Sequence, residues 1–190
     1  AITTIIKHLI TIVFFFFFFD CDENIHEVLK PWIELKSQYN FVFSIAHGPF
    51  KEYLDLYKTT DKGNPSWYNQ YKDSIDNFYF HNGELEHEAR NNALQFLLKN
   101  GCDLIWLLDF DEFYTAPQID SIIKYVEKDV DTAWYKVCFK NYVFDNQTFI
   151  AEPFCPPRIF KRKIYNYTLS KCYWDNDFCY QHNDKNEEII

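Results

Sequence analysis

Residues 103–112 read DLIWLLDFDE, a continuous apolar run that stops at two carboxylates, Asp109 and Asp111. The run is short and contains neither Gly nor Pro, which is typical of a strand buried on both faces of a parallel or mixed sheet. Side chains alternate along a strand, so both carboxylates are expected to point the same way where the strand ends. Ligands bind at the carboxyl ends of strands in open α/β sheets, and paired carboxylates there suit a hard divalent cation. The alternative is a pair of helix-capping or solvated loop carboxylates.

Residues 83–101, just before this strand, predict a helix. Its apolar residues recur at helical spacing along one stripe: Leu85, Ala89, Ala93, Phe96 and Leu97. Acidic residues fill the first turn, Lys99 lies in the last turn, and Gly101 follows as a C-terminal cap. The helix therefore leads directly into the strand that ends at the two carboxylates.

This helix–strand segment resembles a known family. EARNNAL at residues 88–94, GCD at 101–103 and LLDFDE at 107–112 resemble the pattern ARN-x-A-L … G-x-D-x-(apolar)-D-x-D-E of GT-A fold glycosyltransferases, especially the family-2-like group. The resemblance is strongest over about residues 84–115. It implies an α/β fold with a central mixed, mostly parallel sheet flanked by helices, and with a small β-hairpin region on the acceptor side.

The chain has the size of one domain, which we place over residues 1–190. It is short for a complete GT-A unit, contains no Met and begins at Ala1, so a truncated or processed chain is an alternative. The formal net charge of −9 argues against nucleic-acid binding, which needs a basic surface. An anionic nucleotide donor would therefore need a cation or local basic side chains.

The N-terminal apolar run covers residues 9–19 and ends in a series of phenylalanines. It is too short to span a bilayer, for which about 20 residues are needed. We therefore favour the first buried strand of the sheet over a membrane anchor or a signal-peptide core. Membrane association is compatible with this run but is not required by it.

The six cysteines form no CxxC pair and no zinc-ligand spacing. Cys102 and Cys138 lie within or beside expected strands, which predicts that both are small buried side chains. Reduced thiols in a cytoplasmic protein are the resulting expectation.

Helices and strands alternate through the rest of the chain. The expected helices cover residues 24–37, where Pro31 should either kink the helix or mark a new first turn, and 119–126. The expected strands cover residues 41–46, 133–139, 142–144 and 148–150. The last two strands would form the half-exposed hairpin. Residues 58–83 predict a long surface excursion, either a lid or a disordered segment. His47, after the second strand, is a candidate donor contact or else a structural histidine.

The resemblance implies a donor site at the carboxyl ends of the strands. Asp109 and Asp111 would hold Mn²⁺ or Mg²⁺ against the donor diphosphate, and Asp109 would also contact the donor. Arg90 would orient one of these carboxylates through a charge-assisted bond. Asp22 and Glu23, in the loop after the first strand, would lie under the nucleotide base; their alternative role is a solvated cluster that caps the next helix.

The same resemblance implies a catalytic base further along the chain. Asp175 or Asp177 would take the proton from the acceptor hydroxyl, although DND is also a good turn sequence. His182 would be a third metal ligand, or else a surface histidine. Residues 155–163 are the concentrated basic stretch, which either contacts phosphate or an acidic acceptor, or forms a solvated edge strand with protective lysines.

The leading hypothesis is a metal-dependent, inverting glycosyltransferase that moves a sugar from a nucleotide-sugar donor to an unknown glycan, lipid or protein acceptor. The alternative is a non-catalytic or inactive truncated module that binds nucleotide or carbohydrate. A phosphatase-type hydrolase with a DxD is disfavoured, because its nucleophilic Asp normally follows the first strand and precedes small residues. Here the DxD lies in mid-chain, and Glu112 and Phe113 follow it.

Overall fold

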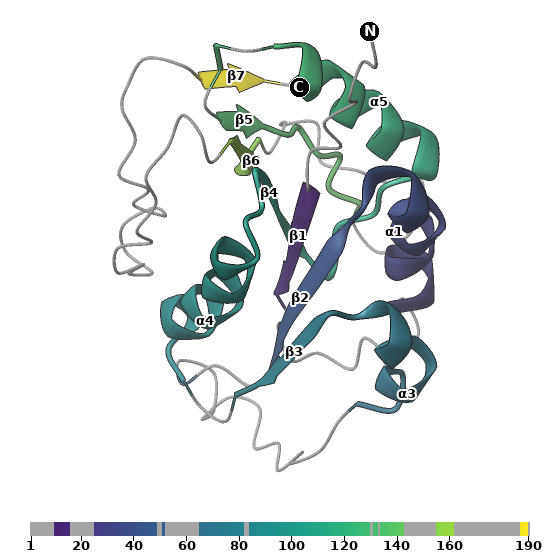
Figure 1. Ribbon diagram of the computed structural model, residues 1–190, viewed down its shortest axis with the longest axis vertical. Helices are drawn as coiled ribbons and strands as arrows, with labels where there is room; N and C mark the ends of the chain where they lie inside the picture. The colour runs from purple at the N-terminus through teal and green to yellow at the C-terminus, as the bar shows by residue number, and fades with distance from the viewer. Residues whose placement is uncertain are drawn as a thin grey trace, which may run out of the picture.

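The computed structural model describes residues 10–15, 25–48, 51, 65–81, 84–129, 131–132, 134–142, 155–161 and 187–189. Its elements, in chain order, are β1 (Ile10–Phe15), α1 (Ile25–Tyr39), β2 (Val42–His47), α3 (Tyr68–Tyr71), the 3-10 helix η2 (Lys72–Ser74), β3 (Asn77–Phe80), α4 (Glu86–Lys99), β4 (Leu104–Asp109), α5 (Ala116–Lys128), β5 (Trp134–Lys136), β6 (Pro157–Lys161) and β7 (Glu187–Ile189). The strands form one sheet that lies between helices (Figure 1).

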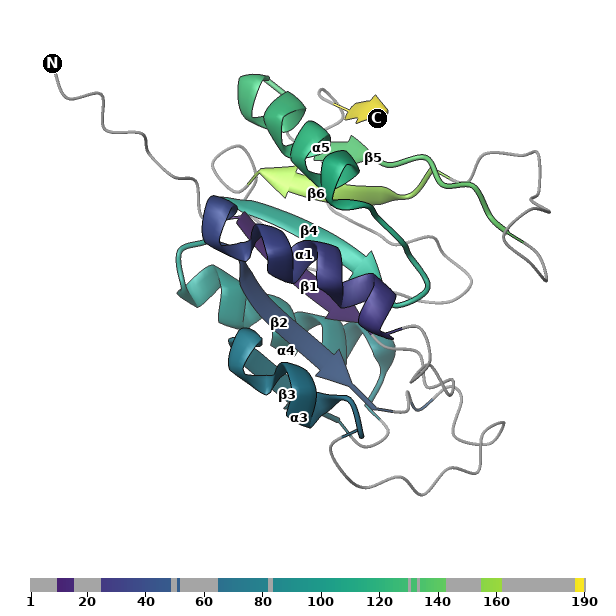
Figure 2. The same cartoon turned by 90° about the vertical axis from the view of Figure 1, so that its right-hand side faces the viewer.

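The sheet is mixed, with strand order β3-β2-β1-β4-β6-β5-β7. β1 to β4 run parallel to one another, whereas β6 is antiparallel to both of its neighbours, β4 and β5. Figure 2 shows β1, β2 and β4 pointing one way and β6 pointing the other. The predicted mixed, mostly parallel α/β sheet is thus confirmed, and the carboxyl ends of four parallel strands share one edge.

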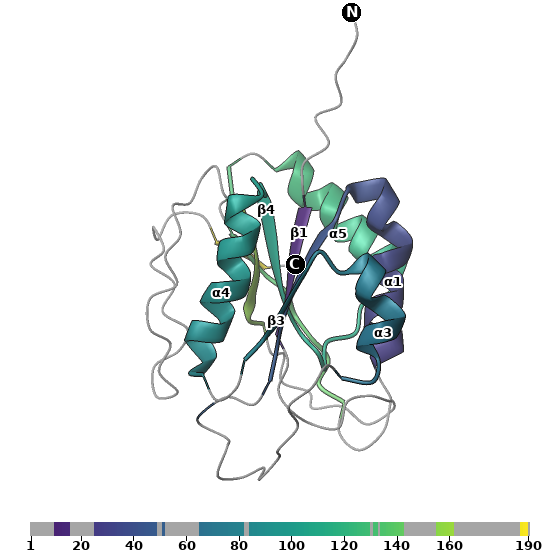
Figure 3. The same cartoon turned by 60° about the horizontal axis from the view of Figure 1, so that its bottom comes forward.

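Helices cover both faces of the sheet. α4 lies on one face, and α1, α3 and α5 lie on the other (Figure 1, Figure 3). Small and aliphatic side chains such as Ala93 and Ile105 fill the α4 side. The opposite side is aromatic: Trp32 of α1 and Trp106 of β4 are fully buried and pack edge to face, with ring centroids 4.8 Å apart. β4 is therefore buried on both faces, as its unbroken apolar run predicts.

The two helices next to β4 in the sequence form as predicted, because their end signals are local. α4 ends before Gly101, whose φ of 76° is a left-handed conformation that glycine adopts at little steric cost. α5 begins after Thr115, whose hydroxyl accepts a hydrogen bond from the amide of Gln118. α1 also forms where expected and continues through Pro31 as one helix.

The N-terminal apolar run contributes the central strand β1, which lies between β2 and β4. Its register pairs Phe15 with Ala46 on one side and with Asp109 on the other. The predicted strand is confirmed for residues 10–15. Within the ranges that the structure describes, no helix is long and apolar enough to cross a membrane.

The prediction of an unstructured excursion over residues 58–83 is wrong for residues 65–81. This part holds α3, η2 and β3, and β3 extends the parallel sheet beside β2. Asp76 anchors it, because its carboxylate accepts hydrogen bonds from the Phe43 amide at 2.8 Å and from Lys36 at 2.7 Å. Residues 58–64 and 82–83 of that region, and residues 143–150 of the expected hairpin, lie outside the described residues.

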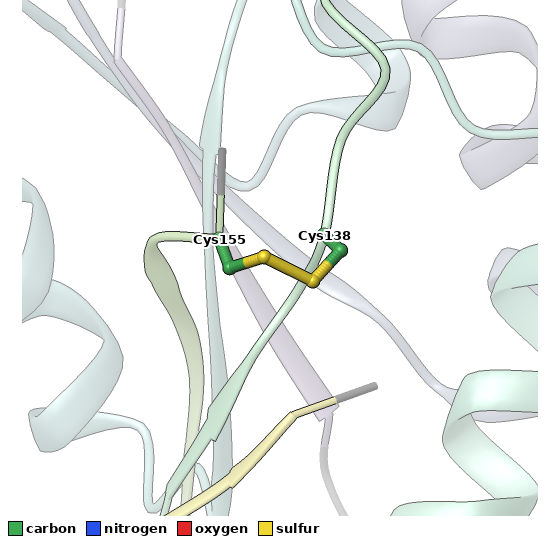
Figure 4. The surroundings of a disulfide bond; sticks show 2 residues. All are labelled: Cys138 and Cys155. Carbon is green, nitrogen blue, oxygen red and sulfur yellow. A yellow bond between two sulfur atoms is a disulfide. The ribbon is translucent and has the colours of Figure 1, made fainter. Parts of the chain in front are cut away.

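Cys138 and Cys155 form a disulfide across a sequence separation of 17 residues (Figure 4). The prediction of a buried, reduced Cys138 is therefore wrong, whereas Cys102 is a buried, reduced thiol as predicted. Pairing of β5 with β6 explains the difference, because it brings together two cysteines that the sequence holds far apart. Disulfides persist mainly in oxidising compartments. The expectation of a cytoplasmic location rested on reduced thiols, and the disulfide removes that support.

Candidate functional site

β4 delivers Asp109 to the carboxyl edge of the sheet, where the chain turns. The Glu112 amide donates a hydrogen bond to the Asp109 carbonyl at 3.0 Å, which closes this turn. Phe110 points into the core, with 4 % of its surface exposed, and its ring stacks on Trp67 at a centroid distance of 6.0 Å. Asp111 is the exposed member of the turn.

Arg90 of α4 reaches the same turn from one face of the sheet. Its side chain is buried, and Nη2 lies 3.3 Å from Oδ1 of Asp109. Helical spacing accounts for this position, because Arg90 follows Ala89 and precedes Ala93 on the face that α4 packs against the sheet. One oxygen of Asp109 is thus already paired with a guanidinium.

Arg158 of β6 pairs with the other oxygen of Asp109. Its Nη2 lies 2.8 Å from Asp109 Oδ2, and its Nε donates to Oε1 of Glu112 at 2.8 Å. Nη2 also bonds the same Glu112 oxygen. Both Arg158 and Glu112 are buried. A single guanidinium therefore bridges the first and last residues of the turn.

Two interpretations of the basic stretch over residues 155–163 are wrong for Arg158. β6 is an interior strand between β4 and β5, so it is not a solvated edge strand. Arg158 is buried and forms ion pairs within the protein, so its guanidinium is not accessible to a phosphate at the surface. Lys161 also turns to the protein, where it donates to the Tyr135 hydroxyl at 2.6 Å.

Burial raises the pKa of Glu112 to about 8, even though the Arg158 guanidinium opposes the rise. Oε1 receives the bonds from Arg158, whereas Oε2 is buried and has no hydrogen-bond partner among the described residues. A neutral carboxyl group tolerates that position better than a carboxylate does. With Glu112 neutral, the guanidinium groups of Arg90 and Arg158 are balanced by the carboxylates of Asp109 and Asp111.

The pKa of Asp111 is raised as well. Its side chain reaches solvent, yet the surrounding protein partly desolvates the carboxylate, and the Asp109 carboxylate repels its charge. Within the described ranges, Asp111 forms no ion pair with a basic side chain. A cation bound beside Asp111 would relieve this electrostatic cost.

The described residues contain no group of three or more His, Cys, Asp or Glu side chains arranged to hold a metal ion. Asp109 is already paired with Arg90 and Arg158, which leaves Asp111 as the available carboxylate. One or two carboxylates suffice for Mg²⁺ when substrate phosphates supply further ligands. The arrangement therefore fits a cation that arrives with a diphosphate better than a cation held by the protein alone.

His47 is the last residue of β2, and Gly48 follows it at the same edge of the sheet. The His47 ring is buried among aromatic rings, with Trp67, Phe78 and Phe80 at centroid distances of 5.9 to 6.1 Å. These contacts agree with the structural alternative for His47. Gly48 adopts φ of 144°, and a Cβ there would lie 2.0 Å from the His81 carbonyl oxygen, so the two strand ends approach closely.

A separate open groove of about 430 Å³ lies between α1 and the start of α5. Lys30 and Glu34 line one side, and Phe113 and Thr115 line the other. None of the carboxylates at the end of β4 lines it. The candidate site is therefore an edge of the sheet rather than this groove.

The structure brings together three of the residues named from the sequence: Arg90, Asp109 and Asp111. Five others lie outside the described residues: Asp22, Glu23, Asp175, Asp177 and His182. Sequence reasoning missed the roles of Glu112 and Arg158. Glu112 directly follows the paired carboxylates, and Arg158 is the first basic residue of the concentrated basic stretch. Neither position in the sequence indicates that the two side chains pair.

No protein-family model matches the chain, and no curated protein matches it. Among solved structures, it is similar to S. aureus TarS, both in a complex with UDP (TM-score 0.47, 12 % identity, 73 % of this chain covered) and in a longer form (TM-score 0.48, 11 %, 82 %). The chain spans 38 % and 29 % of those two structures, which is less than half of their length. It is also similar to 4-diphosphocytidyl-2C-methyl-D-erythritol synthase from Anaerococcus prevotii, with a TM-score of 0.44 and 11 % identity, covering 97 % of this chain and 87 % of that one.

Proposed function

We propose that this chain is a metal-dependent glycosyltransferase that binds a nucleotide-sugar donor at the carboxyl edge of its parallel strands. The observation that supports this most is the turn after β4, where exposed Asp111 lies beside Asp109 and its two arginine partners. A carboxylate that can hold a cation at this edge is what an anionic diphosphate requires in a chain of net charge −9.

In this proposal, Asp111, assisted by Asp109, is a protein ligand of Mn²⁺ or Mg²⁺, and the cation neutralises the charge that develops on the departing nucleoside diphosphate. Asp109 contacts the donor, and Arg90 fixes the orientation of its carboxylate. Asp22 and Glu23 lie near the base. The transfer inverts the anomeric carbon and ends on a glycan, lipid or protein acceptor.

Asp175 or Asp177 is proposed as the base that takes the proton of the acceptor hydroxyl. His182 is proposed as a further ligand of the cation. These assignments come from their order in the chain after the DxD, and each is tested by its own Asn or Gln variant in a turnover assay.

The deciding experiment is calorimetric titration with UDP, GDP, CMP and dTDP, in Mn²⁺ and again in EDTA. We expect one nucleotide to bind in Mn²⁺ and to lose binding in EDTA. Asp111→Asn should weaken Mn²⁺-dependent nucleotide binding at least tenfold. The urea concentration at the midpoint of unfolding should stay the same as in the wild type. Asp73→Asn removes an exposed carboxylate from η2 and should bind as the wild type does.

Absence of binding to all four nucleotides, in a sample that unfolds cooperatively, would refute the donor site. Binding without release of nucleoside diphosphate from any nucleotide sugar would instead favour the non-catalytic module. A non-catalytic module would bind nucleotide at the same turn after β4, so Asp111→Asn would weaken binding in either case. The turnover assay therefore distinguishes the transferase from the module.

A further inference from the structure

The turn after β4 is held at both ends by one side chain from another part of the sheet. Arg158 bonds the Asp109 carboxylate with Nη2 and the Glu112 carboxyl group with Nε. The backbone hydrogen bond from the Glu112 amide to the Asp109 carbonyl closes the same turn. Between these ends, Phe110 is fixed in the core by its burial and its stack on Trp67. Asp111 is the remaining residue, and it projects outward.

The position of Arg158 is fixed by contacts on several sides. β6 pairs with β4 so that Ile159 lies opposite Trp106, which sets Arg158 near the end of β4. The Phe139 ring lies 5.9 Å from its guanidinium carbon. The disulfide at Cys155 ties the chain three residues earlier to Cys138. The guanidinium therefore enters the turn from a fixed direction.

The fork of the guanidinium matters for this bridge. Its N–H donors lie in a rigid plane on separate nitrogens, so one side chain bonds two carboxyl groups in a fixed geometry, whereas the three donors of lysine share one nitrogen. Lysine at position 158 would keep the positive charge near Asp109, but with one donor nitrogen on a flexible stem it should hold the two ends of the turn less firmly.

We infer that Arg158 is a positioning residue for the cation ligand: by fixing Asp109 and Glu112, it sets the direction in which Asp111 leaves the sheet. The cation at Asp111 belongs to the proposed function, and this inference rests on it. Arg158 does not touch the donor in this arrangement, and it acts on cation binding through the conformation of the turn.

The first test needs no ligand. Hydrogen exchange followed by NMR should show that the Glu112 amide exchanges at least tenfold faster in Arg158→Lys than in the wild type, with the amides of β4 unchanged. Lys161→Gln is the matched control, because it removes a basic side chain with its own hydrogen bonds from the opposite end of β6. Unchanged protection of the Glu112 amide in Arg158→Lys would overturn the inference.

The second test measures the Mn²⁺ concentration at which binding of UDP, GDP, CMP or dTDP is half-maximal. We expect Arg158→Lys to raise it at least tenfold, Lys161→Gln to leave it unchanged, and nucleotide affinity to return to the wild-type value at saturating Mn²⁺. An unchanged half-maximal concentration would overturn the inference. So would a loss of affinity that persists at saturating Mn²⁺, because it would mean that Arg158 contacts the nucleotide directly.

The two tests separate this inference from the proposed function. If the wild type binds none of the four nucleotides, the donor site fails, and hydrogen exchange still decides whether Arg158 holds the turn. If the wild type binds one of them in Mn²⁺ and Arg158→Lys behaves as the wild type in both tests, the donor site stands and the positioning role fails.

Discussion

Replacing Glu112 by glutamine should make the protein more resistant to rising pH. Glu112 is 7 % exposed, and burial raises the pKa of its carboxyl group from 4.5 to about 8, against the opposing effect of Arg158. The folded state therefore holds this proton more tightly than the unfolded chain does. The resulting stabilisation is fully present below pH 4.5 and is lost as the pH rises through about 8.

The size of the effect follows from the difference between the two pKa values. Each pKa unit corresponds to about 1.4 kcal/mol, so the shift from 4.5 to about 8 sets a ceiling of about 5 kcal/mol. Glutamine has the same shape and keeps an oxygen that accepts from Arg158, but it has no proton to lose. The free energy of unfolding of Glu112→Gln, relative to the wild type, should therefore increase by about 2–5 kcal/mol between pH 5 and pH 8.

The assay is urea unfolding of both proteins at pH 5, 6, 7 and 8 in metal-free buffer, compared at equal denaturant slope. Glu127→Gln, which changes an exposed side chain of α5, is the control and should show no such trend. The reasoning is refuted if the wild type gains stability over Glu112→Gln as the pH rises. That result would mean that the ion pair with Arg158 outweighs burial and keeps Glu112 charged.

Three further predictions concern stability. Reduction of the Cys138–Cys155 disulfide, or its replacement by two serines, should lower the free energy of unfolding by about 3 kcal/mol, measured by urea unfolding; a serine variant that still responds to reductant would contradict this assignment. Gly48→Ala should cost more than about 1 kcal/mol in the same assay, because its Cβ would overlap the His81 carbonyl, and a neutral result would show that the strand ends move apart easily. Thr115→Ala should cost about 1 kcal/mol by removing the cap of α5, with Thr115→Ser close to the wild type; equal losses in both variants would exclude capping as the cause.

The parts of the fold that sequence predicts well are those with local signals. The apolar run of β4 and the cap at Gly101 lie within a few residues of the structure that they specify. β3 is missed because its short aromatic run follows a polar region rich in turn residues, and its strand character depends on pairing with β2.

The candidate site likewise has residues that the sequence predicts and a pairing that it does not. Asp109 and Asp111 are found from the sequence because they end a strand, and Arg90 because it lies on the preceding helix. The partnership of Arg158 with Asp109 and Glu112 joins residues 49 and 46 positions apart. No local pattern encodes such a pair, because it depends on which strand the sheet places beside β4.

The position of β6 has a consequence for the order of assembly. β1 to β4 form a contiguous parallel unit, but β4 gains its second neighbour only when residues 157–161 arrive. Until then its six-residue apolar strand is an open edge, which is a template for pairing with other chains during synthesis or refolding. When β6 docks, it covers the edge and delivers Arg158 to Asp109 and Glu112 in the same step.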